Sequence, residues 1–492
     1  MTPNDLMIFA KTIWGEARGE TVEGQIAVAH VIVNRARKGG WWGDTVPGVC
    51  LKPKQFSCWN EGDPNRSKMG ELSLDNRALA RAVSIAAGVH DRLGPDCGQP
   101  GLVRQHHGTH AVALGQSVGD YRVVEDADTG FALPRIAKAW ILHMGRSDSF
   151  TSKVHELIAE ADVCIDPSNG REVALLSALK TAAHGDGIGA GTLLEAHLED
   201  NPTDLLAHRL VQFELFWNGR AVWMRDIIER AAPYWSDAVE GFHQFLSCRA
   251  FSNEEAGHYE AAEGYGRQAV EMQPADVWGT HAVAHVLVMQ GRIDDGVEWL
   301  EHLCGNWQAA NQIKHHLWWH LCLFLLERQE HERILELLIT QIRNPESPLV
   351  KALPDATIDL QNVASLLMRL ELRGVDVGDR WQVVADICEG RTTNHANAFS
   401  NAHDMMVLAA SGRFEQARAL LSSVREYLQE ERAQSGNLAG SYRSAGLALC
   451  EGLLAHRKGQ YALVIDSLAP IRHDLPRIGG SHAQRDLFTQ LQ

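Results

Sequence analysis

The stretch that decides the fold of most of the chain is Asp276–Leu300, DVWGTHAVAHVLVMQGRIDDGVEWL. Apolar residues recur at helical spacing on both sides of Gly291, which predicts two helices joined by a glycine turn. Similar glycines earlier in the chain follow one another at intervals of 34, 38 and 34 residues up to Gly291. Six glycines open a helix in this way: Gly185, Gly219, Gly257, Gly291, Gly412 and Gly459.

This spacing is typical of the tetratricopeptide repeat, a helix pair of about 34 residues. Pro202 and Pro274 each lie 17 residues after their glycine, where a proline ends the second helix of a pair. No segment after about Ala132 shows the alternation of a strand. We therefore predict an α-helical solenoid over residues 102–492, whose concave side binds a protein, a peptide or a small molecule.

The first ninety residues have a different composition. Helical patterns lie around Leu6–Ile13 and Leu74–Val89, with a segment rich in Trp, Gly and Pro between them. The densest Gly and Pro cluster, Leu93–Gly101, predicts a linker. The predicted organisation is a head at 1–92, a linker at 93–101 and the repeat domain at 102–492.

The chain has 492 residues, with 46 basic against 62 acidic side chains and a net charge of −16. This balance argues against nucleic acid or an anionic membrane as the main partner. No apolar run has the length of a transmembrane helix, and the N-terminus lacks the pattern of a signal peptide. Nine cysteines without a CxxC pair suit a reducing compartment. We expect a cytoplasmic protein without a cofactor.

Five ordered motifs in the helical part carry a family resemblance. They are DVWGTHAVAHVLVMQGRIDDGVEWL, HHLWWHLCLFLLE, MRLELRGVDVGDRWQ, FSNAHDMM and IGGSHAQRDLF. From about Asp126 to the C-terminus the chain resembles the tetratricopeptide repeat protein 38 family, a cytoplasmic helical-repeat group. The resemblance implies a fold and leaves the activity open. This chain has Asn362 and Asn401 where the family usually has Asp, and Leu317 where it usually has Asn.

Paired histidines mark a candidate second pocket in these motifs. His281 and His285 are one helical turn apart, and His316 and His320 repeat the spacing. Three interpretations stay open: hydrogen-bonded core residues, a pocket for an anionic or peptide-like ligand, and a metal site. We assign no metal from the sequence, which contains no HExxH motif. The full candidate set is Asp276, His281, His285, His316, His320, Asp359, Arg369, Arg380 and His403.

The start of the chain contains the motifs WGEARGE at Trp14–Glu20, QFSCWN at Gln55–Asn60 and DPNR at Asp63–Arg66. With Gly24-Gln25 and Asn34-Arg35 between them, these motifs resemble the SleB-like cell wall hydrolases, which cut peptidoglycan. The resemblance implies a small lysozyme-like or transglycosylase-like α+β head. The predicted fold class is thus mainly α, with this head in front of the repeats.

The resemblance places the catalytic glutamate of a lytic transglycosylase at Glu16. Such an enzyme needs one carboxylic acid, which protonates the leaving oxygen and then acts as base on the muramic 6-hydroxyl. We expect Glu16 in a partly apolar cleft against Trp14, with Glu20 positioning it or the substrate. The alternative for Glu20 is a surface ion pair with Arg18 or Arg35. Sugar-binding candidates are Trp14, Gln55, Phe56 and Trp59, and the alternative for these is packing.

After about Val89 the sequence departs from the hydrolase pattern, so the head is predicted to lack its C-terminal segment. A complete head requires residues after Gly101 to close the cleft beside Glu16, whereas an incomplete one leaves Trp41, Trp42 and Trp59 partly exposed or covered by the repeats. The first functional interpretation is a peptidoglycan-cleaving enzyme joined to a helical binding domain. The second is a cytoplasmic repeat protein with a His-rich pocket and an inactive hydrolase remnant. A gene-level fusion without a joint function is the third.

Overall fold

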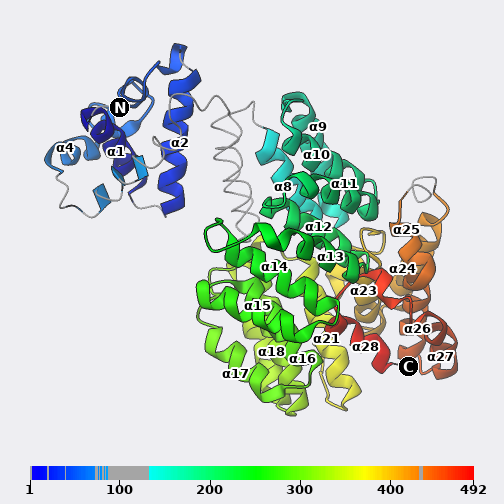
Figure 1. The fold of residues 1–492 in the computed structure, drawn as a ribbon. Coiled ribbons are helices and arrows are strands. Elements are labelled where there is room, and N and C mark those ends of the chain that lie inside the picture. The colour runs from blue at the N-terminus through cyan, green and yellow to red at the C-terminus, as the bar shows by residue number, and fades with distance from the viewer. Residues whose placement is uncertain are drawn as a thin grey trace. The chain divides into compact units, whose positions relative to one another are not determined.

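The computed structural model describes residues 3–18, 22–38, 40–72, 76, 78–79, 82–83, 85–86, 132–430 and 436–491. The chain divides into two compact units, 1–107 and 108–492 (Figure 1). Regular structure in the described ranges is helical throughout and includes no strand, so the mainly α prediction is confirmed. None of the described helices has both the length and the apolar character needed to span a membrane. The predicted linker at 93–101 lies outside the described residues.

The first unit is built around its first helix. The helix buries Phe9 and Ile13 against Ile32 of the second helix and Val49 of the third. The β part predicted for the head does not occur among its described residues, which form helices and two short 3-10 turns. These elements are α1 Pro3–Ala17, α2 Val22–Lys38, η1 Gly40–Trp42, α3 Val46–Cys50, η2 Ser57–Trp59 and α4 Pro64–Glu71.

The second unit consists mainly of consecutive helix pairs, and most of its helices pack on the next helix along the chain; α22 packs on α23. Their apolar faces form a large core that runs from Val270 to Leu491 and another that runs from Ala132 to Ile227. The pairs are α8 Ala132–Met144 with α9 Thr151–Cys164, α10 Gly170–Ala183 with α11 Gly187–Asp200, α12 Leu205–Trp217 with α13 Ala221–Ala231, α14 Phe242–Glu255 with α15 Tyr259–Met272, α16 Val277–Met289 with α17 Ile293–Leu303, α18 Ile313–Glu327 with α19 His331–Leu337, α21 Thr357–Leu372 with α22 Gln382–Glu389, α23 Ala398–Ala410 with α24 Phe414–Tyr427, and α26 Leu447–Arg457 with α27 Tyr461–Leu468. Shorter helices are α20 Pro348–Ala352, α25 Leu438–Ser441 and the C-terminal α28 His482–Gln490.

The glycine turns occur where the sequence predicts them. All six predicted turn glycines have left-handed backbone angles, with φ between 64° and 84°, and each lies between the two helices of a pair. Pro202 and Pro274 follow the ends of α11 and α15, also as predicted. Two further turns are not among the six predicted. Gln329 (φ 59°) takes the glycine's place between α18 and α19, and Gly374 (φ 75°) lies between α21 and α22. A helical solenoid agrees with these pairs, and the resemblance to the repeat protein 38 family stays a prediction.

The second unit also folds back on itself. The backbone N–H of Leu438 donates to the carbonyl of Gly185 at 3.2 Å, and the N–H of His395 donates to Asp148 Oδ2 at 2.7 Å. The last helix, α28, packs against α16 and α21 (Figure 1). A helix of the same chain therefore lies on two of the helices that begin pairs, and ligand binding on a concave side stays a prediction.

Candidate functional site

Glu16 lies in the last turn of α1, and its side chain is exposed. Its Oε1 atom accepts the backbone N–H of Cys58 at 2.8 Å and the Ser57 hydroxyl at 3.2 Å. Its Oε2 atom has no hydrogen bond within the described ranges. One oxygen of this exposed carboxyl is anchored to the Ser57–Trp59 turn, and the expected partly apolar cleft around it stays a prediction.

Gly15 explains how α1 comes close enough to that turn. A Cβ atom at this position would lie 2.5 Å from Cys58 Cβ, 2.8 Å from Cys58 Sγ and 3.1 Å from Met69 Sδ. Contacts below 3.0 Å exclude a side chain unless the neighbouring atoms shift. Gly15 therefore allows α1 to lie close to Cys58, and this closeness lets the adjacent Glu16 accept the hydrogen bond from the Cys58 N–H.

The four candidate sugar-binding residues fall into two groups. Trp14 and Phe56 are buried, with 6% and 7% of their surface exposed, which favours the packing interpretation for both rings. Trp59 is half-buried, and its indole N–H donates to Thr12 Oγ1 at 2.8 Å. The Gln55 amide, also half-buried, donates to the carbonyl of Trp42 at 2.8 Å. Of the four, Trp59 and Gln55 offer the more accessible surface.

Two predictions about the head involve residues that the structure does not describe. Glu20 lies outside the described residues, and so do the residues after Gly101 that would close the cleft. Among the described tryptophans, Trp41 is 70% exposed, whereas Trp42 and Trp59 are half-buried. Whether the head is complete stays a prediction, because the residues that would cover these rings lie outside the described ranges.

Residues 19–93 match the family described as Cell Wall Hydrolase. The matched range includes Gln55, Phe56 and Trp59 and begins three residues after Glu16.

Curated relatives match this chain over a short region. The chain is 43% identical over 76 residues to a spore cortex-lytic enzyme of Oceanobacillus iheyensis, covering 15% of this chain and 27% of the relative. It is 41% identical over 59 residues to the enzymes of that name from Bacillus cereus and Bacillus subtilis, covering 12% of this chain and 22% and 19% of the relatives. The chain therefore spans about a quarter or less of the length of these relatives.

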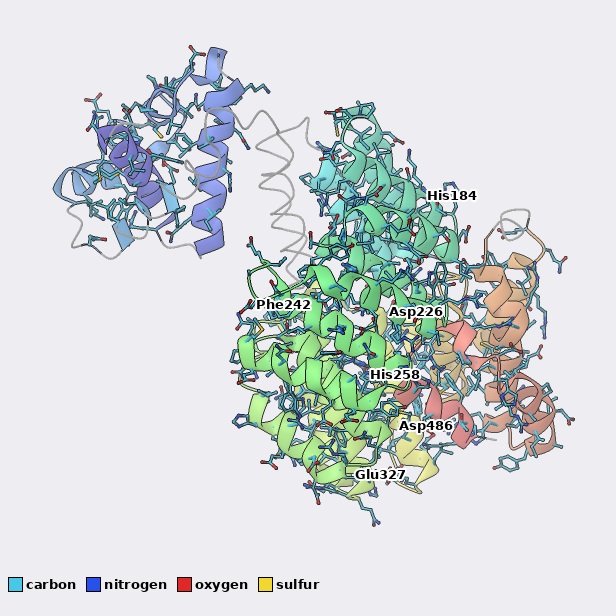
Figure 2. The ribbon with its side chains drawn as sticks, viewed as in Figure 1. His184, Asp226, Phe242, His258, Glu327 and Asp486 are labelled. Carbon is cyan, nitrogen blue, oxygen red and sulfur yellow. The ribbon has the colours of Figure 1, made fainter. Side chains whose placement is uncertain are left out.

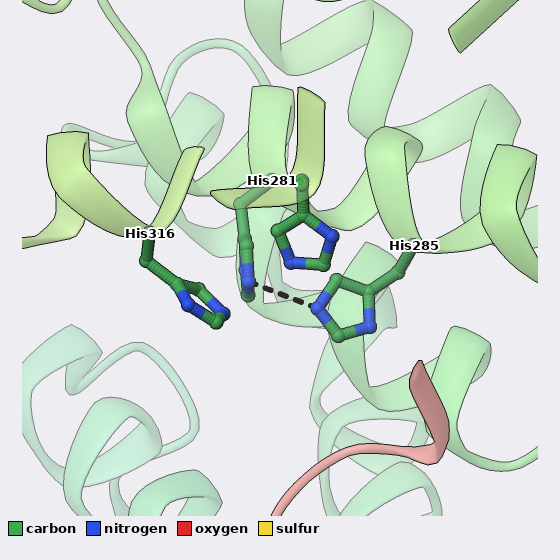
Figure 3. A group of neighbouring side chains, drawn as sticks. His281, His285 and His316 are labelled. Atoms are coloured by element: carbon green, nitrogen blue, oxygen red, sulfur yellow. Dashed lines mark hydrogen bonds between the residues drawn. The ribbon is translucent and has the colours of Figure 1, made fainter. Parts of the chain in front are cut away.

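The second unit brings together the two predicted histidine pairs. His281 and His285 on α16 face His316 and His320 on α18, and all four side chains are buried. Figure 3 shows the labelled rings of His281, His285 and His316 pointing toward one another. Each of the four residues offers a ring nitrogen that lies within 4.8 Å of the nitrogens offered by the others. We call these four residues the histidine cluster.

Burial sets the charge of the histidine cluster. It lowers the pKa of His285 to about 4 and that of His316 to about 3. It also lowers the pKa values of His281 and His320 well below the usual range. The four rings are therefore uncharged at neutral pH, and each keeps a nitrogen lone pair.

The histidine cluster has specific polar neighbours. His316 Nδ1 donates to Asn362 Oδ1 at 2.8 Å, and His285 Nδ1 lies 3.4 Å from Glu254 Oε2. Burial raises the pKa of Glu254 and of its neighbour Glu255 to about 8, which favours their protonated forms at neutral pH. Adjacent carboxylates on a helix carry no signal by themselves, so these two glutamates could not be recognised as site residues from the sequence.

The other predicted pocket residues have different partners. Asp276 caps α16 by accepting the N–H of Trp278 and of Gly279, and Asp359 accepts a hydrogen bond from His315 at 2.9 Å. The remaining three bind backbone carbonyls: Arg369 that of Ala483, Arg380 that of Val377 and His403 that of Phe399. No hydrogen bond within the described ranges joins any of these five to the histidine cluster. The structure thus brings together the four histidines by direct contact, and a pocket that includes the other five residues stays a prediction.

Arg369 instead lines a cavity of about 650 Å³ beside α28. Figure 2 labels Asp486 on α28 and Glu327 at the end of α18, and both line this cavity. Its walls do not include the histidine cluster. His482, at the start of α28, connects the two regions, since it lines the cavity and its Nδ1 lies 3.4 Å from Glu255 Oε2.

Proposed function

We propose that the first unit cleaves the glycan strands of peptidoglycan as a lytic transglycosylase, with Glu16 as its acid and base. The observation that carries this proposal is the anchored, solvent-exposed carboxyl of Glu16 beside the turn that contains the half-buried Trp59. The match of residues 19–93 to cell wall hydrolases supports the substrate class. So does the similarity to enzymes named for the lysis of spore cortex.

The reaction needs one carboxyl group. The Glu16 acid gives its proton to the glycosidic oxygen, and the bond from the anomeric carbon of muramic acid to that oxygen breaks. The resulting carboxylate takes the proton of the muramic 6-hydroxyl while that oxygen bonds to the anomeric carbon. The products are a 1,6-anhydro end and a free N-acetylglucosamine hydroxyl, and Glu16 is protonated again.

The two oxygens of Glu16 have different roles in this scheme. Oε1 is held by the Cys58 N–H and the Ser57 hydroxyl, so the carboxyl keeps one orientation. Oε2 is left to carry the proton toward the sugar.

The test is digestion of purified sacculi by the full chain, followed by mass spectrometry of the released muropeptides. The wild type should release 1,6-anhydro products, and Glu16→Gln should release none. Glu61→Gln, which changes an exposed carboxylate of the same unit, should leave the products unchanged. Glu20→Gln separates the two glutamates: loss of products in this variant alone would move the catalytic role to Glu20.

For the second unit we propose a binding role toward a protein, peptide or small molecule, in the cytoplasm. The competing proposal is that the first unit is an inactive remnant and that function lies in the second. The 70% exposure of Trp41 is the observation that favours it, because a finished head would cover more of such a ring. If the folded wild type releases no product from sacculi that another lytic enzyme digests, the remnant proposal replaces the first.

A further inference from the structure

We propose that His281, His285, His316 and His320 bind one divalent transition-metal ion, Zn²⁺ by preference, in a structural site that joins α16 to α18. The proposal concerns the second unit and does not depend on the proposed cleavage of peptidoglycan.

The arrangement of the rings suits one ion. Each helix supplies two histidines one turn apart, so four imidazoles converge from two directions. Ring centroids lie 4.3 Å apart for His281 and His285, 4.7 Å for His316 and His320, and 4.4 Å for His285 and His320. Nitrogens that bind Zn²⁺ tetrahedrally at 2.0–2.1 Å lie about 3.3 Å from one another. The ligand nitrogens already lie within 4.8 Å of one another, so ion binding requires the rings to approach by at most about 1.5 Å.

Hydrogen bonding among the described residues leaves the histidine cluster unsatisfied. His281 Nε2 and His285 Nε2 lie 2.9 Å apart, so one of them donates to the other (Figure 3). His320 is fully buried, and neither of its ring nitrogens has a hydrogen-bond partner in the described part of the chain; the same holds for His281 Nδ1. A buried polar atom without a partner costs about 1–3 kcal/mol. A core that only packed these helices together would not need such atoms, whereas a metal ion uses the lone pairs.

A hydrogen bond from one neighbouring side chain orients the ring of His316 for metal binding, and a carboxyl group lies close to the ring of His285. His316 Nδ1–H donates to Asn362 Oδ1 at 2.8 Å, which leaves the lone pair on Nε2. His285 Nδ1 lies 3.4 Å from Glu254 Oε2, while its Nε2 points at His281. In metal sites the second ring nitrogen of a ligating histidine almost always donates to such an oxygen.

The surroundings identify the class of metal and its role. Four imidazoles suit Zn²⁺, Cu²⁺ or Ni²⁺ and disfavour Ca²⁺ or Mg²⁺, which take oxygen ligands. Aromatic rings enclose the site, since Phe251 stacks on His281 and Trp319 stacks on His316. Four protein ligands fill a tetrahedral shell, which is the mark of a structural site rather than a catalytic one. The ion would thus fix the second unit across two successive helix pairs.

The test uses the full chain, treated with a chelator, with its helical content checked by circular dichroism. Zn²⁺ is titrated in competition with a chromophoric chelator, and Co²⁺ is added separately for its visible spectrum. We expect one ion per chain, a strong tetrahedral Co²⁺ absorption and an upward shift of the unfolding temperature with Zn²⁺. His320→Gln should weaken binding more than about 100-fold, and Asn362→Ala should weaken it about 10-fold through the orientation of His316.

His403→Gln is the matched control, because it removes a buried histidine of the same unit whose Nδ1 binds the carbonyl of Phe399. Its affinity for Zn²⁺ should equal that of the wild type. If His320→Gln does not fold, the Zn²⁺ affinity of His316→Gln and the Co²⁺ spectrum of the wild type test the proposal instead. A folded wild type that binds neither ion more tightly than a His281→Gln/His320→Gln variant would overturn the proposal, and so would a six-coordinate Co²⁺ spectrum.

Discussion

Replacing Gly15 with alanine tests the close approach on which the position of Glu16 depends. The new Cβ would lie 2.5 Å from Cys58 Cβ, an atom that cannot rotate away because it is attached directly to the backbone. Overpacking of this kind costs about 3 kcal/mol at the upper end. The higher helix propensity of alanine offsets about 1 kcal/mol of this loss. The first unit should therefore lose about 2 kcal/mol of stability, together with the Cys58 N–H bond to Glu16.

Hydrogen exchange followed by mass spectrometry measures this loss within the full chain. Peptides from α1 and α3 should exchange about 30-fold faster, which corresponds to 2 kcal/mol, and release of muropeptides should fall. Gly264→Ala is the control: it lies within α15, and its Cβ would meet no atom within 4 Å. That variant should be stabilised slightly. Unchanged exchange in α1 after Gly15→Ala would refute the argument that the glycine is required for the close approach.

Two further predictions concern the second unit. Burial opposes ionisation of Glu214, but Arg146 at 2.8 Å and His143 at 3.1 Å outweigh it and lower its pKa to about 2. Because the pKa of Glu214 is lower in the folded chain than in the unfolded chain, ionised Glu214 stabilises the folded state fully above about pH 4.5. This stabilisation is lost as the pH falls toward 2. Glu214→Gln should cost about 3 kcal/mol at pH 7, with a smaller difference at pH 3 in thermal unfolding; an equal difference at both would contradict the ion pair. Asp276→Ala should cost about 1 kcal/mol through the cap of α16, and Asp276→Asn should cost much less, measured by hydrogen exchange in the first turn of α16.

Local patterns predicted the helix pairs well, because the turn between two helices requires a backbone conformation that glycine adopts at little cost. Gln329 adopts it as well, and no sequence signal marks that turn. The i,i+4 spacing predicted that each histidine pair lies on one face of its helix. It did not show that the two faces meet, and it did not reveal the partners Asn362 and Glu254, which come from other helices.

The environment of Glu16 was predicted less well. Its anchor is a backbone N–H 42 residues further along the chain, and a backbone donor has no residue type that sequence reasoning can recognise. The contacts of the C-terminal half with the first helices of the second unit could not be predicted for a related reason. His395 and Asp148 are 247 residues apart, and their contact follows no period in the sequence.

These contacts change how the second unit should fold. In an open array each repeat touches its neighbours alone, so pieces can form and melt almost independently. Here residues near Gly185 pair with Leu438, and Arg369 of α21 holds the carbonyl of Ala483 in α28. Contacts of such long range favour slow, all-or-none folding. A ribosome must therefore finish almost the entire chain before the unit can close, and loss of the last dozen residues would weaken helices made long before them.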